Sequence, residues 1–177
     1  MPGLDGHTRT CRLNASKRVA KFSALVIDAT DTTTISGAIF VKLPSGANVG
    51  PVAGVTIGHW LEPNVFYAED TDPSTITGTT PSPPYASMLG GTGIDIGPTL
   101  QISGQARCYS ASSAITAGKV LVIADAYGRV DTAAHLSIGA GTLIYPVGIA
   151  RTNSSDAAND VVLVDLNFMP TYMTTGM

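Results

Sequence analysis

Histidines are the first residues of this sequence with a potential for metal or acid–base chemistry. His7, His59 and His135 stand singly in unrelated contexts. None forms an H-x-x-H or H-E-x-x-H pattern or a Cys/His cluster, which are the spacings that transition-metal sites use. We therefore predict that the chain holds no metal and no cofactor.

Two further stretches resemble ligand-binding motifs only in part. In a calcium loop that started at Asp70, Thr75 would replace the required glycine and Pro81 the bidentate glutamate. In the glycine-rich stretch 91–97, the last spacing is one residue too long for a dinucleotide fingerprint, and no helical pattern follows. There is also no nucleophile elbow and no Walker motif. These observations favour a protein that is not an enzyme.

The two cysteines do not form a metal motif either. Cys11 and Cys108 are far apart in the sequence, whereas a C-x-x-C pair would be close. Reduced thiols are the default for a protein made in the cytosol, so we expect both to be free. A bridge between them is the alternative.

The content of charged residues is low. Only 13% of the residues are charged, about half of the roughly 25% that is usual in soluble domains, while 44% are hydrophobic. A chain with so few charges has little with which to keep a large surface hydrated. This composition favours an obligate oligomer or a component of a larger assembly over a free monomer.

The charges are also divided unevenly along the chain. Residues 1–22 contain five bases and one acid, a net charge of +4, whereas the remainder has five bases and twelve acids, a net charge of −7. We expect residues 1–20 to form an extended basic arm that docks onto an acidic surface. The alternative is a solvated leader, and a nucleic acid is the weaker partner because five bases make a small footprint. The basic residues of this expected contact are Arg9, Arg12, Lys17, Arg18 and Lys21.

Strand patterns dominate residues 21–166, and no helical period is sustained over three turns. The aliphatic run 120–124, the turn 125–128 and the segment 129–132 predict one hairpin. The runs 147–150 and 161–166, which flank a polar tip, predict a second hairpin. Further strands are expected within 21–28, 35–43, 52–57, 94–104 and 105–109. The sequence thus predicts an all-β domain.

Two segments are expected to face other chains in an assembly. The loop 72–93 is rich in Pro, Ser, Thr and Gly and is too long for an ordinary connection. The tail 167–177 is rich in methionine and almost uncharged, so it could lie in a groove on another subunit. The candidate interface residues are Trp60, Tyr85, Phe168, Met169, Tyr172 and Met173.

No apolar run approaches the roughly 18 residues of a membrane span. The N-terminus also lacks the basic, apolar and small-residue succession of a secretion signal. We therefore expect a soluble protein, made in the cytosol, with no membrane partner.

Residues 106–166 resemble a known family. The resemblance lies in Tyr109-Ser-Ala-Ser-Ser-Ala-Ile-Thr-Ala-Gly-Lys-Val-Leu-Val, Asp125-Ala-Tyr-Gly-Arg-Val, Pro146-Val-Gly-Ile-Ala and Asp160-Val-Val-Leu-Val-Asp-Leu. These stretches, over about a third of the chain, are similar to the head-decoration or cement proteins of tailed bacteriophages. The resemblance implies a small β-barrel or β-tulip domain that forms a homotrimer. It also implies a location on the outer capsid surface of the virion, where the trimer clamps neighbouring major capsid proteins.

Two other classes of function remain open at this stage. A receptor- or glycan-binding module of the virion, such as a head spike or fibre tip, would use exposed aromatic residues for sugar stacking. Its candidate residues are Trp60, Tyr67, Tyr85 and Tyr109. A β-barrel enzyme or metal-dependent hydrolase is the third class, and a metal retained by the purified protein would support it.

Overall fold

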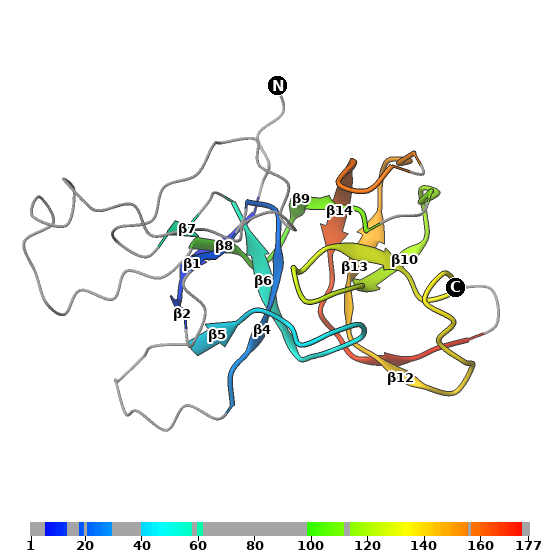
Figure 1. The fold of residues 1–177 in the computed structure, drawn as a ribbon, viewed down its shortest axis with the longest axis horizontal. Helices are drawn as coiled ribbons and strands as arrows, with labels where there is room; N and C mark the ends of the chain where they lie inside the picture. The colour runs from blue at the N-terminus through cyan, green and yellow to red at the C-terminus, as the bar shows by residue number, and fades with distance from the viewer. Residues whose placement is uncertain are drawn as a thin grey trace, which may run out of the picture.

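The prediction of an all-β protein is confirmed by a computed structural model of the chain (Figure 1). The structure describes residues 6–13, 18–19, 21–29, 40–57, 60–61, 99–111, 114–155 and 157–174. Within these ranges every regular element is a strand. In the same residues there is no helix long and apolar enough to cross a bilayer.

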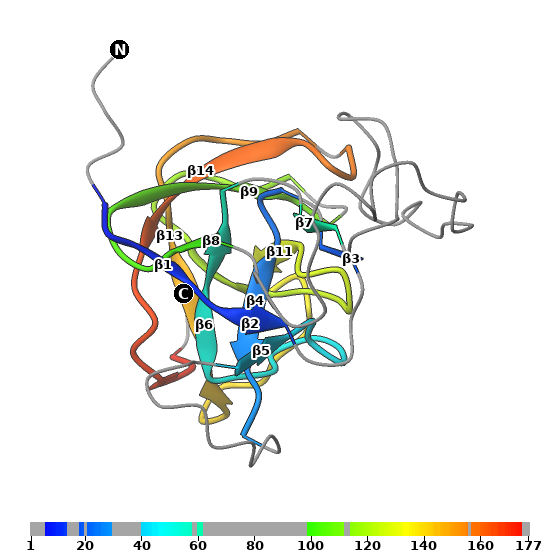
Figure 2. The same cartoon turned by 90° about the vertical axis from the view of Figure 1, so that its left-hand side faces the viewer.

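Six strands form the first sheet, which Figure 2 views most directly. Their order is β1 (Thr8–Thr10), β8 (Thr99–Gln101), β6 (Val52–Thr56), β4 (Ala24–Ile27), β5 (Phe40–Lys42) and β2 (Arg12–Leu13). All neighbours are antiparallel except β2 and β5, which are parallel. The sheet therefore brings together strands that are spread along the chain from residue 8 to residue 101.

Five antiparallel strands form the second sheet. Their order is β11 (Val130–Thr132), β10 (Val120–Ile123), β13 (Pro146–Ala150), β14 (Val161–Leu166) and β9 (Gln105–Tyr109). Two short pairs complete the fold: β3 (Arg18–Val19) with β7 (Trp60–Leu61), and β12 (Leu143–Ile144) with β15 (Thr171–Tyr172). The residues of the family resemblance thus supply all five strands of the second sheet.

Both predicted hairpins are confirmed. Strands β10 and β11 pair antiparallel, with Ile123 opposite Val130, and β13 and β14 pair antiparallel, with Ala150 opposite Val164. In the first turn, Asp125 accepts a backbone hydrogen bond from Tyr127 at 2.9 Å, which is a local side-chain turn. The second turn is likewise held by local side-chain bonds, as Asp160 accepts the amide of Ser155 at 2.7 Å.

The main core lies between the two large sheets. Side chains alternate along β4, so this strand directs Ala24 and Val26 into the main core and Leu25 to the opposite face. Each fully buried Val, Leu or Ile contributes about 1.5–3 kcal/mol relative to exposure. The buried members of the main core are Ala24, Val26, Val52, Val55, Ala106, Cys108, Ile115, Leu121, Ile123, Val130, Val147, Ala150, Val162 and Val164.

Two smaller clusters lie on the outer faces of the sheets. Cys11, Val19, Leu25, Val41 and Leu100 pack together on the far side of the six-stranded sheet. On the far side of the five-stranded sheet lies a group that we call the tail cluster, formed by Val122, Ala133, Ile144 and Met173. The fold is therefore layered, with a main core inside and an apolar cluster on each outer face.

The sheets do not close into a barrel, which corrects the shape that the resemblance implied. The edge strands β9 and β11 of the five-stranded sheet approach each other at a single bridge, between Ser110 and Val130. One bond, from the amide of Ala111 to the carbonyl of Val130 at 3.0 Å, accompanies it. A closed barrel needs a continuous ladder between its edges, and here β9 ends at Tyr109 just as the edges meet.

Both ends of the described chain belong to this body. Strand β1 pairs with β8 and strand β2 with β5, so residues 8–13 lie within the six-stranded sheet. Residues 167–174 continue from β14 and return as β15 on β12. The described parts of the segments that the sequence predicts to be an arm and a tail therefore pair with strands of this fold.

Candidate interaction surface

Of the predicted basic residues, the structure describes the side chains of Arg9 and Lys21. Arg9 is exposed on edge strand β1, opposite Leu100. Lys21 is half-buried, and its Nζ lies 5.7 Å from the ring centre of Phe22. For Arg12 and Arg18 the structure describes the pairing of their strands, β2 and β3. Lys17 lies outside the described residues.

Of the predicted interface aromatics, Trp60 lies on β7, opposite Val19 of β3. Tyr85 and the whole loop 72–93 lie outside the described residues, as does Tyr67. Tyr109 is half-buried, and its ring packs on that of Phe22 with 5.5 Å between the ring centres. Such a tilted pair contributes about 0.5–1.5 kcal/mol beyond its buried area. Tyr109 therefore helps to hold the segment before β4 against β9.

The four predicted residues of the C-terminal segment divide into two groups. Phe168 packs against the main core and Met173 is buried in the tail cluster, so both serve the fold of their own chain. Met169 and Tyr172 are 73% and 65% exposed, respectively. Residues on alternate sides of an extended segment have opposite environments. The segment is thus anchored by one pair of side chains and presents the other pair to the outside.

Backbone bonds fix this segment in place. The amide of Met173 donates to the carbonyl of Thr142 at 2.8 Å, and the amide of Gly141 donates to the carbonyl of Met173 at 2.9 Å. Further back, Asn167 donates to the carbonyl of Val147 at 3.0 Å. These bonds hold the start of the segment against β13 and its end beside β12. Its exposed side chains consequently have a defined position.

Strand β12 is itself fixed by Asn48, which sequence reasoning did not single out. The side-chain amide of Asn48 donates to the carbonyl of Leu143 at 3.0 Å, while its oxygen accepts the amide of Tyr145 at 3.0 Å. The amide of Asn48 also donates to the carbonyl of Ile123 at 2.8 Å. One residue from the loop after β5 thus connects β10, β12 and the start of β13.

A pocket of about 340 Å³ opens beside the C-terminal segment. Its lining comes from the start of β10, from β13 and from the segment between β14 and β15, and none of the lining residues is charged. Ile149 contributes a side chain that is 40% exposed. The lining residues are Val120, Pro146, Gly148, Ile149, Asn167, Met169, Pro170 and Thr171.

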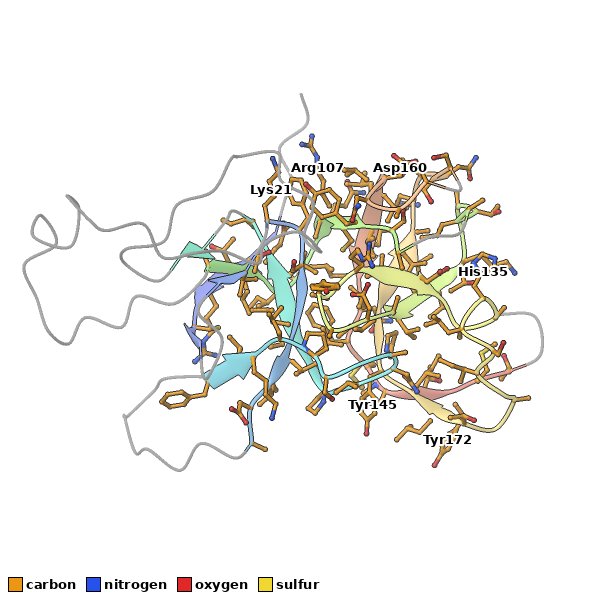
Figure 3. All side chains as sticks on the ribbon, viewed as in Figure 1. Lys21, Arg107, His135, Tyr145, Asp160 and Tyr172 are labelled. Carbon is orange, nitrogen blue, oxygen red and sulfur yellow. The ribbon has the colours of Figure 1, made fainter. Side chains whose placement is uncertain are left out.

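The pocket and its surroundings form an apolar surface that we call the C-terminal face. It consists of the pocket together with Leu143 and Tyr172, which are paired across β12 and β15. Leu143 is 39% exposed, and Figure 3 shows Tyr172 pointing away from the body of the chain. The composition of the tail indicated such a surface, but Leu143 and Ile149 could not be identified from the sequence, because the contacts that place them beside the tail join distant residues.

Several titratable side chains of the described residues make structural contacts. Buried Asp131 accepts a bond from the amide of Thr132 at 2.7 Å and lies 2.7 Å from Nδ1 of His135. Asp28 pairs with Lys42 at 3.0 Å. Sequence reasoning missed the contact of Asp131 with His135, because it depends on the turn that follows β11. In the part of the chain that the structure describes, no group of three metal-ligating side chains exists.

The thiols are buried, and the expectation that they are free is confirmed. Cys108 is in the main core, whereas Cys11 is on the opposite face of the six-stranded sheet, so a bridge between them is impossible in this fold. Burial raises the pKa of the Cys108 thiol to about 12 and also raises the pKa of Cys11. Both thiols are therefore protonated and weak nucleophiles at neutral pH.

In the described structure, the polar and charged groups discussed above make contacts within the chain. The C-terminal face is the apolar surface best suited to contact another molecule. Comparison of the sequence with models of known protein families and with curated proteins finds no match.

Proposed function

We propose that this chain is a structural, non-enzymatic decoration protein of a tailed-bacteriophage head. In this proposal it forms a homotrimer on the outer capsid surface and staples neighbouring major capsid proteins together, which stabilises the mature head. The observation that carries the proposal is the uncharged C-terminal face, on which Met169 and Tyr172 are largely exposed. Together with the low charge content, an apolar surface of this kind favours burial against other chains.

The resemblance of residues 106–166 to cement proteins supplies the particular assembly. Those residues build the whole five-stranded sheet and carry much of the C-terminal face on β12 and β13. The segment with the family resemblance therefore contributes part of the surface available for assembly, and residues 167–172 contribute the rest. The shared location supports the proposal.

Stabilisation of a shell by such a protein follows from linkage. A ligand that binds the expanded lattice more tightly than it binds the free capsid subunit stabilises the lattice. The stabilisation grows with this difference in affinity. In a trimer, the second and third contacts become intramolecular, so weak individual sites give tight attachment. The basic residues near the N-terminus, including exposed Arg9, are suited to acidic patches on the shell.

The test is binding of the purified full chain to expanded, undecorated phage capsids, with unexpanded procapsids as the control. We expect saturable binding near the threefold positions of the expanded shell and a higher temperature of capsid disruption when the chain is bound. Binding should weaken as the salt concentration rises if the basic residues contribute. Absence of saturable binding, or equal binding to procapsids, would contradict the proposal.

A further inference from the structure

We propose that the outer face of β13, β14 and β9 docks onto an acidic surface of another protein, with the guanidinium of Arg107 paired to a carboxylate of that partner. That the partner is the major capsid protein rests on the proposed function. The charge and the exposure of the face belong to the described side chains.

The pairing of the three strands brings a set of side chains together on the side of the sheet that faces away from the main core. On β14, Val162 and Val164 are buried in that core, so Val161, Leu163 and Asp165 point outward. The same alternation holds on β9 and β13. We call this set the outer sheet face: Gln105, Arg107, Tyr109, Ile149, Arg151, Val161, Leu163 and Asp165.

Two arginines flank Leu163 on this face. Arg107 lies opposite Leu163 on β9, and the amide of Arg151, directly after β13, donates to the carbonyl of Leu163 at 2.7 Å. Nε of Arg151 is 2.7 Å from a carboxylate oxygen of Asp165, which balances its charge. Among the described residues no acid forms an ion pair with Arg107. Its side chain is exposed and points outward from β9 (Figure 3).

Apolar side chains surround these charges. Ile149 and Val161 are each 40% exposed, and Leu163 is half-buried. Ile149 also lines the pocket of the C-terminal face, so the two surfaces are continuous. A partner that covers the outer sheet face therefore buries apolar area and removes water from Arg107 at the same time.

The removal of water from Arg107 selects the chemistry of the partner. A guanidinium that is buried without a counter-charge is strongly unfavourable, so a purely apolar partner is excluded. A carboxylate opposite Arg107 forms a charge-assisted pair, which can be bidentate. A nucleic acid fits less well, because Asp165 repels phosphate and Ile149 gains nothing from a sugar–phosphate backbone. The partner is therefore a polypeptide surface on which carboxylates stand beside apolar side chains.

Binding of the full chain to expanded, undecorated phage capsids, measured with variants of Arg107, tests this pairing. Arg107→Gln should raise the dissociation constant about 30-fold or more, and Arg107→Glu should raise it further. The matched control is Arg107→Lys, which keeps the charge and should raise the dissociation constant less than about tenfold. Because residue 107 is exposed, all three variants should unfold at the temperature of the wild-type chain.

Cysteine labelling tests the location of the contact independently of charge. Cys11 and Cys108 are buried, so the thiol of a Val161→Cys variant should be labelled much faster than either of them. Binding to the capsid should slow this labelling about tenfold or more. The control is Tyr127→Cys, at an exposed position in the turn between β10 and β11, which should be labelled equally in the free and the bound chain.

The outcomes separate this inference from the proposed function. Unchanged capsid binding by Arg107→Glu, or a Val161→Cys thiol that stays reactive on the capsid, would overturn the inference and leave the proposed function standing. Absence of capsid binding by the wild-type chain would contradict both. Saturable binding of the wild-type chain to a DNA duplex, abolished in Arg107→Glu, would identify a nucleic acid as the partner and also overturn the inference.

Discussion

The carbonyl oxygen of Gly128 accepts a hydrogen bond of 2.8 Å from the amide of Ala24. Gly128 ends the turn between β10 and β11, and Ala24 begins β4 near the middle of the other large sheet. The bond therefore connects the tip of one sheet's hairpin to the other sheet. It closes one edge of the main core, in which Ala24 and Val130 are both buried.

Substitution of Gly128 by alanine should destabilise the protein strongly. Gly128 has a φ of 77°, and an added β-carbon would overlap the carbonyl oxygen of Ala24 and lie 2.9 Å from its amide nitrogen. Strain of the left-handed backbone and overpacking together predict a loss of about 2–5 kcal/mol. The measurement is urea denaturation, which gives the free energy of unfolding.

Gly118→Ala is the matched control for this substitution. Gly118 has a φ of 89°, but nothing lies within 4 Å of an added β-carbon, so only the backbone cost of about 1–2 kcal/mol applies. Equal losses for Gly118→Ala and Gly128→Ala would show that the contact with Ala24 is absent in solution.

Removal of the Asp131 carboxylate should loosen the segment that follows β11. Buried Asp131 accepts the amide of Thr132 and contacts His135, while the hydroxyl of Thr132 accepts the amide of His135 at 3.2 Å. Asp131→Ala leaves the Thr132 amide without this acceptor, which predicts a loss of about 1–3 kcal/mol. Thermal unfolding is the measurement. Asp131→Asn keeps an acceptor oxygen and should cost less, so the idea fails if the two variants are equally destabilised.

The Cys108 thiol should be inert in the folded protein. Burial raises the pKa of Cys108 from its ordinary 9.0 to about 12, which lowers the thiolate fraction at pH 8 by about a thousandfold. We expect a thiol reagent to label Cys108 only after unfolding in urea, as identified by mass spectrometry of the labelled peptide. Rapid labelling of Cys108 in the native protein would contradict its position in the main core.

The tip between β13 and β14 should respond to acid through Asp160. Hydrogen bonds from the Ser155 amide, and further bonds from Ser155 and Val161, lower the pKa of the Asp160 carboxyl. Because the pKa of the folded state is depressed, the stabilisation is present at neutral pH and is lost as the pH falls through that pKa. The Ser155 amide chemical shift should therefore titrate with a midpoint below about 3.9, the ordinary value for aspartate.

Asp160→Asn is the control for this titration. The variant should abolish the transition at the Ser155 amide and leave distant amides unaffected. A wild-type midpoint at or above the ordinary aspartate value would show that the bonds to Ser155 do not form in solution.

Local patterns were enough to predict the two hairpins. Val120–Ile123 and Val161–Leu166 are rich in β-branched residues, and the polar tips contain Asp125 and Asp160, whose side chains bond to the backbone a few residues away. All of these interactions join residues that are close in the sequence. The hairpins can therefore be predicted from neighbouring residues alone.

The position of the strands in the sheets depended on distant partners. Strand β9 precedes both hairpins but pairs with β14, the last strand of the second one. Strands β2 and β15 have only two residues each, too short for a visible period of two. Their pairing depends on which edges the rest of the fold leaves open, and loop closure over long separations leaves no local signature.

By itself, the sequence determined the class of the fold and the two hairpins, because each follows from composition or from neighbouring residues. Only the tertiary structure decided that Met173 and Phe168 pack inside while Tyr172 and Met169 face outward. The four residues look alike as a methionine- and aromatic-rich tail. For Tyr172 and Met173, what separates them is the register of β15 on β12, in which one step along the chain exchanges the exposed face for the buried one.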